Sequence, residues 1–84
     1  MELSEEAKRV ALETAIKNTA SEIYVLCLQI NIDPDELDVE NPEAMFPENL
    51  TEADPNFYTF TRISRACASN RLATRKLALL DSQG

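Results

Sequence analysis

The stretch SEEAKRVALETAIKNTASEIYVLCLQI, from Ser4 to Ile30, decides the fold because it reads as one continuous amphipathic helix. Ser4 is suited to cap the amino end, and Glu5 and Glu6 complement the positive end of the helix dipole. The apolar residues recur three or four positions apart, which keeps them on one face. They are Leu12, Ile16, Ala20, Ile23, Cys27 and Ile30. We therefore expect a helix over residues 4–30.

The last two turns of this expected helix carry more apolar residues than one face can hold. Tyr24, Val25 and Leu28 lie off the main stripe, so this end of the helix is apolar nearly all round. A helix with apolar side chains on every side is normally enclosed from several directions. We expect such an enclosure here.

Residues 31–54 form what we call the acidic connector. From Asp33 to Asn56 the chain has nine carboxylates, four prolines and neither Lys nor Arg. Asx-Pro pairs are typical of helix starts, and the first two predict short turns over 34–39 and 42–46. A partial turn is also expected over 51–54. Apolar residues interrupt the acids, which predicts an ordered connector lying on a core. They are Leu37, Val39, Met45, Phe46 and Leu50.

A second amphipathic helix is predicted over residues 55–80, after the Asp54-Pro55 pair. Its stripe again has the spacing of a helix face. The stripe comprises Phe60, Ile63, Cys67, Asn70, Thr74 and Leu77, with Ala66 and Ala73 beside it. Small residues let two helices approach closely, and a polar Asn70 at the seam favours one register.

The composition indicates an all-α fold of one domain over residues 1–84. Gly84 is the only glycine, so the Gly-containing turns of β-hairpins have no candidates. The prediction is two long amphipathic helices joined by the acidic connector, in parallel or antiparallel arrangement. A chain of this size builds a core worth only about 3 to 5 kcal/mol, which favours association into a dimeric helical bundle.

Charge is strongly segregated along the chain. Residues 18–61 carry ten acids and no base, whereas residues 62–80 carry five bases and no acid. The bases form what we call the basic face, made of Arg62, Arg65, Arg71, Arg75 and Lys76. The simplest use of this asymmetry is an acidic connector that lies along the basic helix, within one chain or between subunits.

The residue inventory excludes several chemistries. The chain has no His and no Gly-rich loop, which removes His-based catalysis, imidazole metal sites and phosphate-binding motifs. A calcium loop that started at Asp33 would have Asp38 where Gly is required and Ala44 where Glu belongs. We expect no catalytic residues, no cofactor and no metal ligands.

The two cysteines, Cys27 and Cys67, both lie on the apolar stripes of their helices. Free cysteine at such a position packs as a small hydrophobe. A disulfide, or a cysteine-only metal site across a dimer, is the alternative.

The amino-terminal residues lack the pattern of a secretory signal, and the longest apolar run, residues 23–32, is too short to span a bilayer. A cytoplasmic protein without membrane contact is expected.

Three functional hypotheses remain. The first is an adaptor that forms a homodimer and binds protein partners through Tyr24, Val25, Leu28, Leu72 and Leu79. The second is an inhibitor or nucleic-acid-mimicking decoy whose carboxylates enter a basic groove of another protein. Its carboxylates would be Asp33, Asp35, Glu36, Asp38, Glu40 and Glu43. The third, least favoured, is nucleic-acid binding through the basic face.

Overall fold

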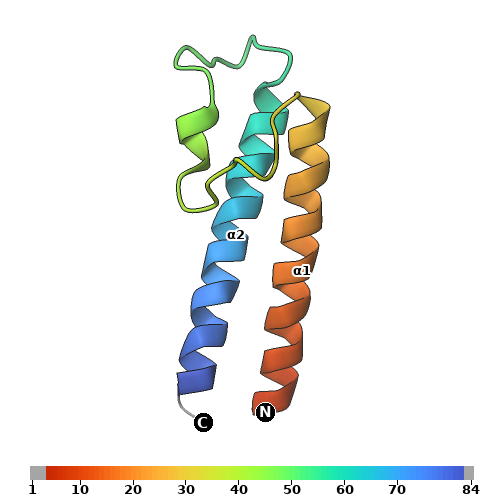
Figure 1. The fold of residues 1–84 in the computed structure, drawn as a ribbon, viewed down its shortest axis with the longest axis vertical. Helices are drawn as coiled ribbons and strands as arrows, with labels where there is room; N and C mark the ends of the chain where they lie inside the picture. Colours follow the sequence, from red (N-terminus) through yellow and green to blue (C-terminus); the bar gives the residue numbers. More distant parts are fainter. Residues whose placement is uncertain (1–3, 83–84) are drawn as a thin grey trace.

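A computed structural model describes residues 4–82 of the chain as two long helices joined by the acidic connector. Helix α1 spans Glu5–Gln29, a short 3-10 helix η1 spans Pro42–Met45, and α2 spans Phe57–Ser82. The long helices are antiparallel, with the first turn of α1 and the last turn of α2 at the same end of the molecule (Figure 1). At the other end the connector loops away and packs back onto α2. The predicted all-α class is confirmed.

Both ends of α1 are explained by local hydrogen bonds. The hydroxyl of Ser4 accepts a hydrogen bond from the amide of Ala7 at 3.1 Å, which confirms the predicted cap. At the other end Asn31 adopts a left-handed conformation with φ 59°. The amide of Ile32 then donates to the carbonyl of Cys27 at 2.9 Å. This Schellman arrangement ends the helix at Gln29, one residue before the predicted end.

Helix α2 begins at Phe57, two residues after the predicted start. The carboxylate of Asp54 accepts from the amide of Asn56 at 2.8 Å, and the amide of Phe57 donates to the carbonyl of Asp54 at 3.0 Å. These bonds place Pro55 in a turn before the helix and not in its first turn. The helix continues to Ser82, two residues beyond the predicted end.

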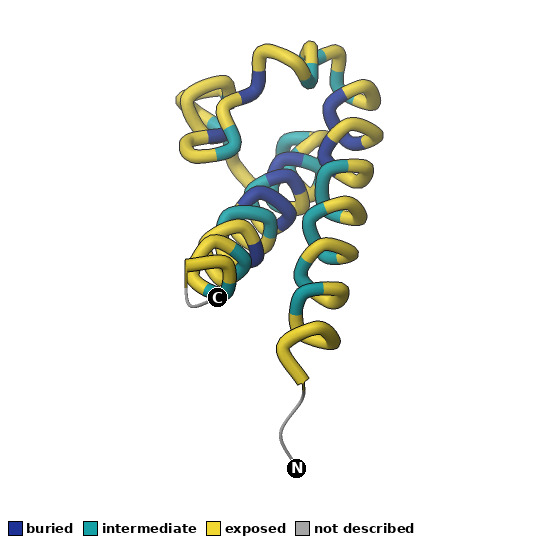
Figure 2. Tube along the Cα trace, turned by 60° about the horizontal axis from the view of Figure 1, so that its bottom comes forward, coloured by how far each residue is buried: buried dark blue, intermediate teal, exposed yellow. Residues whose placement is uncertain are grey.

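The core lies at the connector end of the two-helix hairpin. Its buried apolar residues come from both helices and the connector, as Figure 2 shows by colour. They are Ile23, Leu26, Cys27, Leu37, Ile63, Ala66 and Cys67, with Phe60 and Ala73 buried nearby. Toward the start of α1 and the end of α2 the side chains between the helices are less buried. Leu12, Ile16 and Leu77 are only half-buried there.

Two details of the predicted stripes are corrected. Leu26 is almost fully buried although it lies off the predicted stripe. Thr74 was placed on the stripe of α2 but is exposed, and its hydroxyl donates to the carbonyl of Asn70 at 2.8 Å.

The connector is ordered by turns and by burial of its apolar residues, as predicted. Leu37 and Pro42 are buried, and Val39, Phe46 and Leu50 are half-buried. The first predicted turn is shorter than 34–39. The amide of Glu36 donates to the carbonyl of Asp33, and the amide of Leu37 donates to the carbonyl of Pro34. The second is η1, which Asn41 does not cap with its side chain. The partial turn over 51–54 is present.

Residues 4–82 do not supply the expected enclosure of the carboxyl-terminal end of α1. Its inner side packs on α2 and the connector, but Tyr24, Val25 and Leu28 remain exposed. The helices within residues 4–82 lack the combination of length and apolar character that crossing a bilayer requires.

Candidate interaction surfaces

The connector is attached to α2 by a row of polar contacts. The guanidinium of Arg71 donates to the carbonyl of Val39 at 2.7 Å, in a partly buried position. The hydroxyl of Ser64 donates to the Glu43 carboxylate at 3.1 Å. Farther down, Arg75 and Glu40 form an exposed ion pair at 3.8 Å. The acidic connector therefore does lie against the basic helix within one chain.

The six carboxylates proposed for a decoy surface are all exposed, and five of them have partners in the same chain. Asp33 and Asp38 accept hydrogen bonds from backbone amides two residues later, at 2.9 Å each. Asp35 accepts from the hydroxyl of Tyr24, and this bond and the charge of Asp35 raise the pKa of Tyr24. Glu43 and Glu40 contact α2 as described, and Glu36 projects from the turn. Most of these carboxylates thus stabilise the connector.

The basic face is divided into two flanks. Arg71 and Arg75 lie on the flank that holds the connector. Arg62 lies on the opposite flank and pairs with Glu22 of α1 at 3.4 Å. Arg65 and Lys76 are exposed toward the outer side of α2, and Arg65 also borders the groove between the two helices. The structure therefore does not bring the five bases together into one uninterrupted patch.

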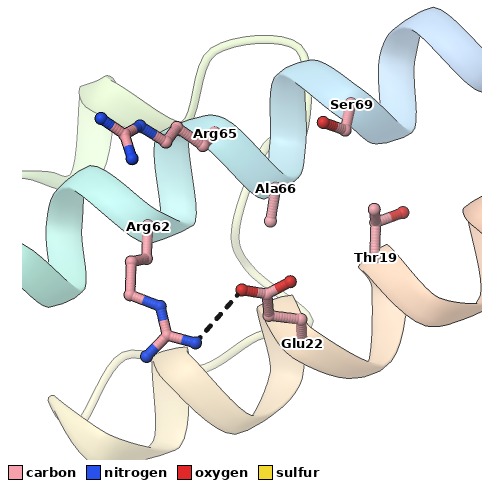
Figure 3. A pocket seen from close by; sticks show the side chains of 6 residues that line it. All are labelled: Thr19, Glu22, Arg62, Arg65, Ala66 and Ser69. Carbon is pink, nitrogen blue, oxygen red and sulfur yellow. Dashed lines mark hydrogen bonds and ion pairs between the residues drawn. The ribbon is translucent and has the colours of Figure 1, made fainter.

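A shallow open groove separates α1 from α2 on the side away from the connector. Its volume is about 230 Å³, and the six residues in Figure 3 line it. They are Thr19, Glu22, Arg62, Arg65, Ala66 and Ser69. Figure 3 shows Arg62 reaching across one end of the groove to Glu22. Thr19, Ala66 and Ser69 are small side chains, and Arg62 and Glu22 are paired with each other. The groove therefore offers little area to hold a ligand.

The five residues proposed as a partner interface form two separate patches. Tyr24, Val25 and Leu28 make up the α1 patch, and they are 47%, 56% and 64% exposed. Leu72 and Leu79 make up the α2 patch, and they are 53% and 62% exposed. These five residues are most of the large apolar side chains that α1 and α2 leave exposed.

Helix geometry places these patches on opposite sides of the hairpin. Val25 comes two residues after buried Ile23, which is about 200° around the helix and so faces away from α2. Leu72 likewise comes two residues after Asn70, which bonds to α1. Figure 2 shows exposed residues along the outer sides of both helices. The two patches therefore cannot form one continuous surface in a single chain.

Sequence reasoning missed two further exposed apolar residues. Tyr58 is 80% exposed, and it precedes Leu72 by fourteen residues and Leu79 by twenty-one. Multiples of seven keep these residues on nearly the same line of α2, and this spacing was the available signal. Val10 is 56% exposed on α1. Val10 precedes Tyr24 by fourteen residues, so the same kind of spacing was available on α1.

Both thiols are free and fully buried in the core. Burial raises the pKa of Cys27, and it raises the pKa of Cys67 to about 11. Such thiols stay protonated at neutral pH and are poor nucleophiles. The prediction that the cysteines pack as core residues is confirmed, and the alternative of a disulfide between them is wrong.

Within residues 4–82, no group of three or more acidic or cysteine side chains is arranged to hold a metal ion. The chemically distinctive surfaces of the described chain are thus the α1 patch, the α2 patch and the charged residues around them.

No protein-family model matches the chain, and neither a curated protein nor a solved structure matches it.

Proposed function

We propose that this protein is a non-enzymatic helical interaction module, which pairs with a second copy of itself and with protein partners through the outer faces of its helices. One observation carries the proposal: the α1 and α2 patches hold five large apolar side chains that the chain leaves about half exposed or more. Exposed apolar patches rimmed by polar residues are typical of protein contact sites.

The energetics of a two-helix hairpin support this proposal. The hairpin has a single seam, and its fully buried residues are gathered at the connector end. Burying a leucine that was exposed contributes about 1.5 to 3 kcal/mol. Covering Leu28, Leu72 and Leu79 would therefore add stability that is large compared with that of a small domain.

A binding role also agrees with the chemistry of the described side chains. The thiols are protonated in the core, and most connector carboxylates hold turns or contact α2. Reduced, buried cysteines favour a reducing compartment, and we propose the cytoplasm as the location. The bonds of Arg71 and Arg62 within the chain, and the division of the basic face into two flanks, make nucleic-acid binding the weaker candidate.

Light scattering on a dilution series tests self-association. The mean mass is expected to rise from that of one chain at low concentration to twice that mass or more at high concentration. The double variant Leu28→Gln, Leu79→Gln removes apolar area from both patches and should stay at the mass of one chain. Met45→Gln, which removes a partly exposed apolar side chain from η1, is the matched control. A wild-type mass of one chain at millimolar concentration would contradict the proposal.

A further inference from the structure

The α1 and α2 patches have rims of opposite charge. Beside the α1 patch, Glu22 lies one helix turn before Val25, and Asp35 accepts the hydrogen bond of Tyr24. No Lys or Arg occurs between residues 18 and 61, and the nearest base on this helix, Lys17, lies about two turns before Tyr24. The α1 patch is therefore an apolar surface with an acidic rim, in which Glu22 also pairs with Arg62 at 3.4 Å while its side chain stays 43% exposed.

The α2 patch has the complementary pattern. Arg75 and Lys76 are each three or four residues from both Leu72 and Leu79, which makes them neighbours of both leucines on the helix surface. Arg65 lies one heptad before Leu72, on the same line. Arg75 contacts Glu40 only at 3.8 Å, and its side chain is 70% exposed. The basic rim is therefore open to a partner.

The two patches are complementary in charge but cannot meet within one chain. They face opposite sides of the hairpin, and they also lie at different heights along it. Asn70 is level with Ile16, whereas Val25 lies nine residues, about 14 Å, farther along α1. A contact between the α1 and α2 patches requires two copies.

We propose that the α2 patch of one copy docks on the α1 patch of a second copy, so that the chains join head to tail. The inference rests on the self-association proposed above and specifies its geometry. Apolar side chains would be buried at the centre, while Arg75 and Lys76 face Glu22 and Asp35 across the rim. Pairing of like patches would instead place two basic rims or two acidic rims together, which is unfavourable.

This geometry has a consequence for assembly size. After one contact, each dimer still has a free α1 patch on one copy and a free α2 patch on the other. A contact between unlike faces continues until the chain of subunits closes into a ring or extends as a filament. The wild-type protein should therefore grow beyond a dimer as its concentration rises.

Mixing two variants tests this arrangement. Val25→Gln with Leu28→Gln disables the α1 patch, and Leu72→Gln with Leu79→Gln disables the α2 patch. Each variant alone should have the mass of one chain in sedimentation equilibrium. An equimolar mixture should form a dimer of one copy of each and grow no further, because each copy retains one working patch. Met45→Gln alone should assemble like the wild type.

The possible outcomes separate the inference from the proposed function. If either patch variant alone still forms dimers, like patches pair, and the head-to-tail contact is overturned while self-association stands. If the mixture stays at the mass of one chain while the wild type assembles, the head-to-tail contact is also overturned. If the wild type never exceeds one chain, both proposals fail.

The charged rim is tested on the same mixed dimer. Lys76→Glu is added to the variant that keeps its α2 patch, and the dissociation constant is expected to rise about 2- to 10-fold. Lys8→Glu on the same copy is the matched control, since Lys8 is an exposed base on α1 and lies outside the α2 patch. Equal effects of these two substitutions would overturn the role of charge in selecting unlike patches.

Discussion

The side-chain amide of Asn70 donates to the hydroxyl of Thr19 across the seam between the two helices, at 2.9 Å. The same amide donates to the carbonyl of Ile16 at 3.2 Å, and the Thr19 hydroxyl donates to the carbonyl of Ala15 at 2.8 Å. A sliding of the helices by one turn would remove these bonds and leave polar groups in the seam. Asn70 thus sets the antiparallel register.

Replacing Asn70 with Ala is expected to lower the free energy of unfolding by about 1 kcal/mol, because two hydrogen bonds across the seam are lost. Ser69→Ala is the matched control. Ser69 is exposed next to Asn70, and its replacement by Ala raises the helix propensity by an amount similar to that of Asn70→Ala. Urea unfolding followed by circular dichroism measures both. Equal stabilities for the two variants would show that the seam bonds contribute nothing net.

Arg71→Ala is expected to loosen the connector more than the helices. The guanidinium bond to the Val39 carbonyl is partly buried, and a hydrogen bond from a charged donor contributes about 1.5 to 3 kcal/mol. Limited digestion with a Glu-specific protease should cut near Glu40 and Glu43 faster than in the wild type. Arg65→Ala, an exposed base on the outer side of α2, should leave the cleavage rate unchanged. If both variants are cut equally fast, Arg71 does not hold the connector.

Asn31→Val is expected to destabilise the protein by about 1 to 2 kcal/mol. The φ of 59° at Asn31 is left-handed, which is costly for a β-branched residue and favourable for Gly. Asn31→Gly should therefore retain or slightly exceed wild-type stability. The comparison by thermal unfolding separates backbone conformation from loss of the side chain. A destabilised Asn31→Gly variant would indicate that the Asn side chain itself matters.

The helices were predictable because their signals are local. The Ser4 cap, the turn at Asp54 and the repeating apolar stripes are written in neighbouring residues, and they gave helix ends within two residues of those observed. Leu26 was left off the predicted stripe although it lies three residues after Ile23 and four before Ile30, so its spacing was an available signal. Asn31 was a missed stop signal, although Asn tolerates the left-handed conformation better than most residues.

The placement of the connector and of the patches could not be read from the sequence. Arg71 bonds to a backbone carbonyl, and every residue carries one, so no sequence pattern identifies Val39 as its partner. The heights of the two patches along the hairpin depend on the antiparallel packing of α1 and α2, and the long connector allows either helix direction. The segregation of charge did predict that the connector contacts the basic helix. The acids lie in one segment and the bases in another, and attraction between the two segments favours such a contact.

Leu26 and Leu28 form a matched pair that distinguishes fold from interface. Leu26 is 2% exposed and Leu28 is 64% exposed, although they are two residues apart. Leu26→Ala should cost about 2 to 5 kcal/mol of stability in dilute protein, because it leaves a cavity in the core. Leu28→Ala should change the stability of the dilute protein by less than about 0.5 kcal/mol but weaken self-association. A loss of stability from Leu28→Ala at low concentration would show that this side chain serves the fold.

High pH should destabilise the protein through the Cys67 thiol. Burial raises the pKa of this thiol from 9.0 to about 11, so the folded chain keeps a proton that the unfolded chain releases. The unfolded chain therefore binds fewer protons between pH 9 and pH 11, and the free energy of unfolding falls as pH rises through this range. Below pH 9 the group has no such effect.

Urea unfolding of the wild type and Cys67→Ala, at several pH values in reducing agent, measures this contribution. Cys67→Ala should be less stable than the wild type at pH 7, because it loses buried volume. Between pH 9 and pH 11 the wild type should lose more stability than the variant, by on the order of 2 kcal/mol. Parallel curves over this range would show that the Cys67 thiol ionises equally well in the folded chain, and hence that its site is open to water.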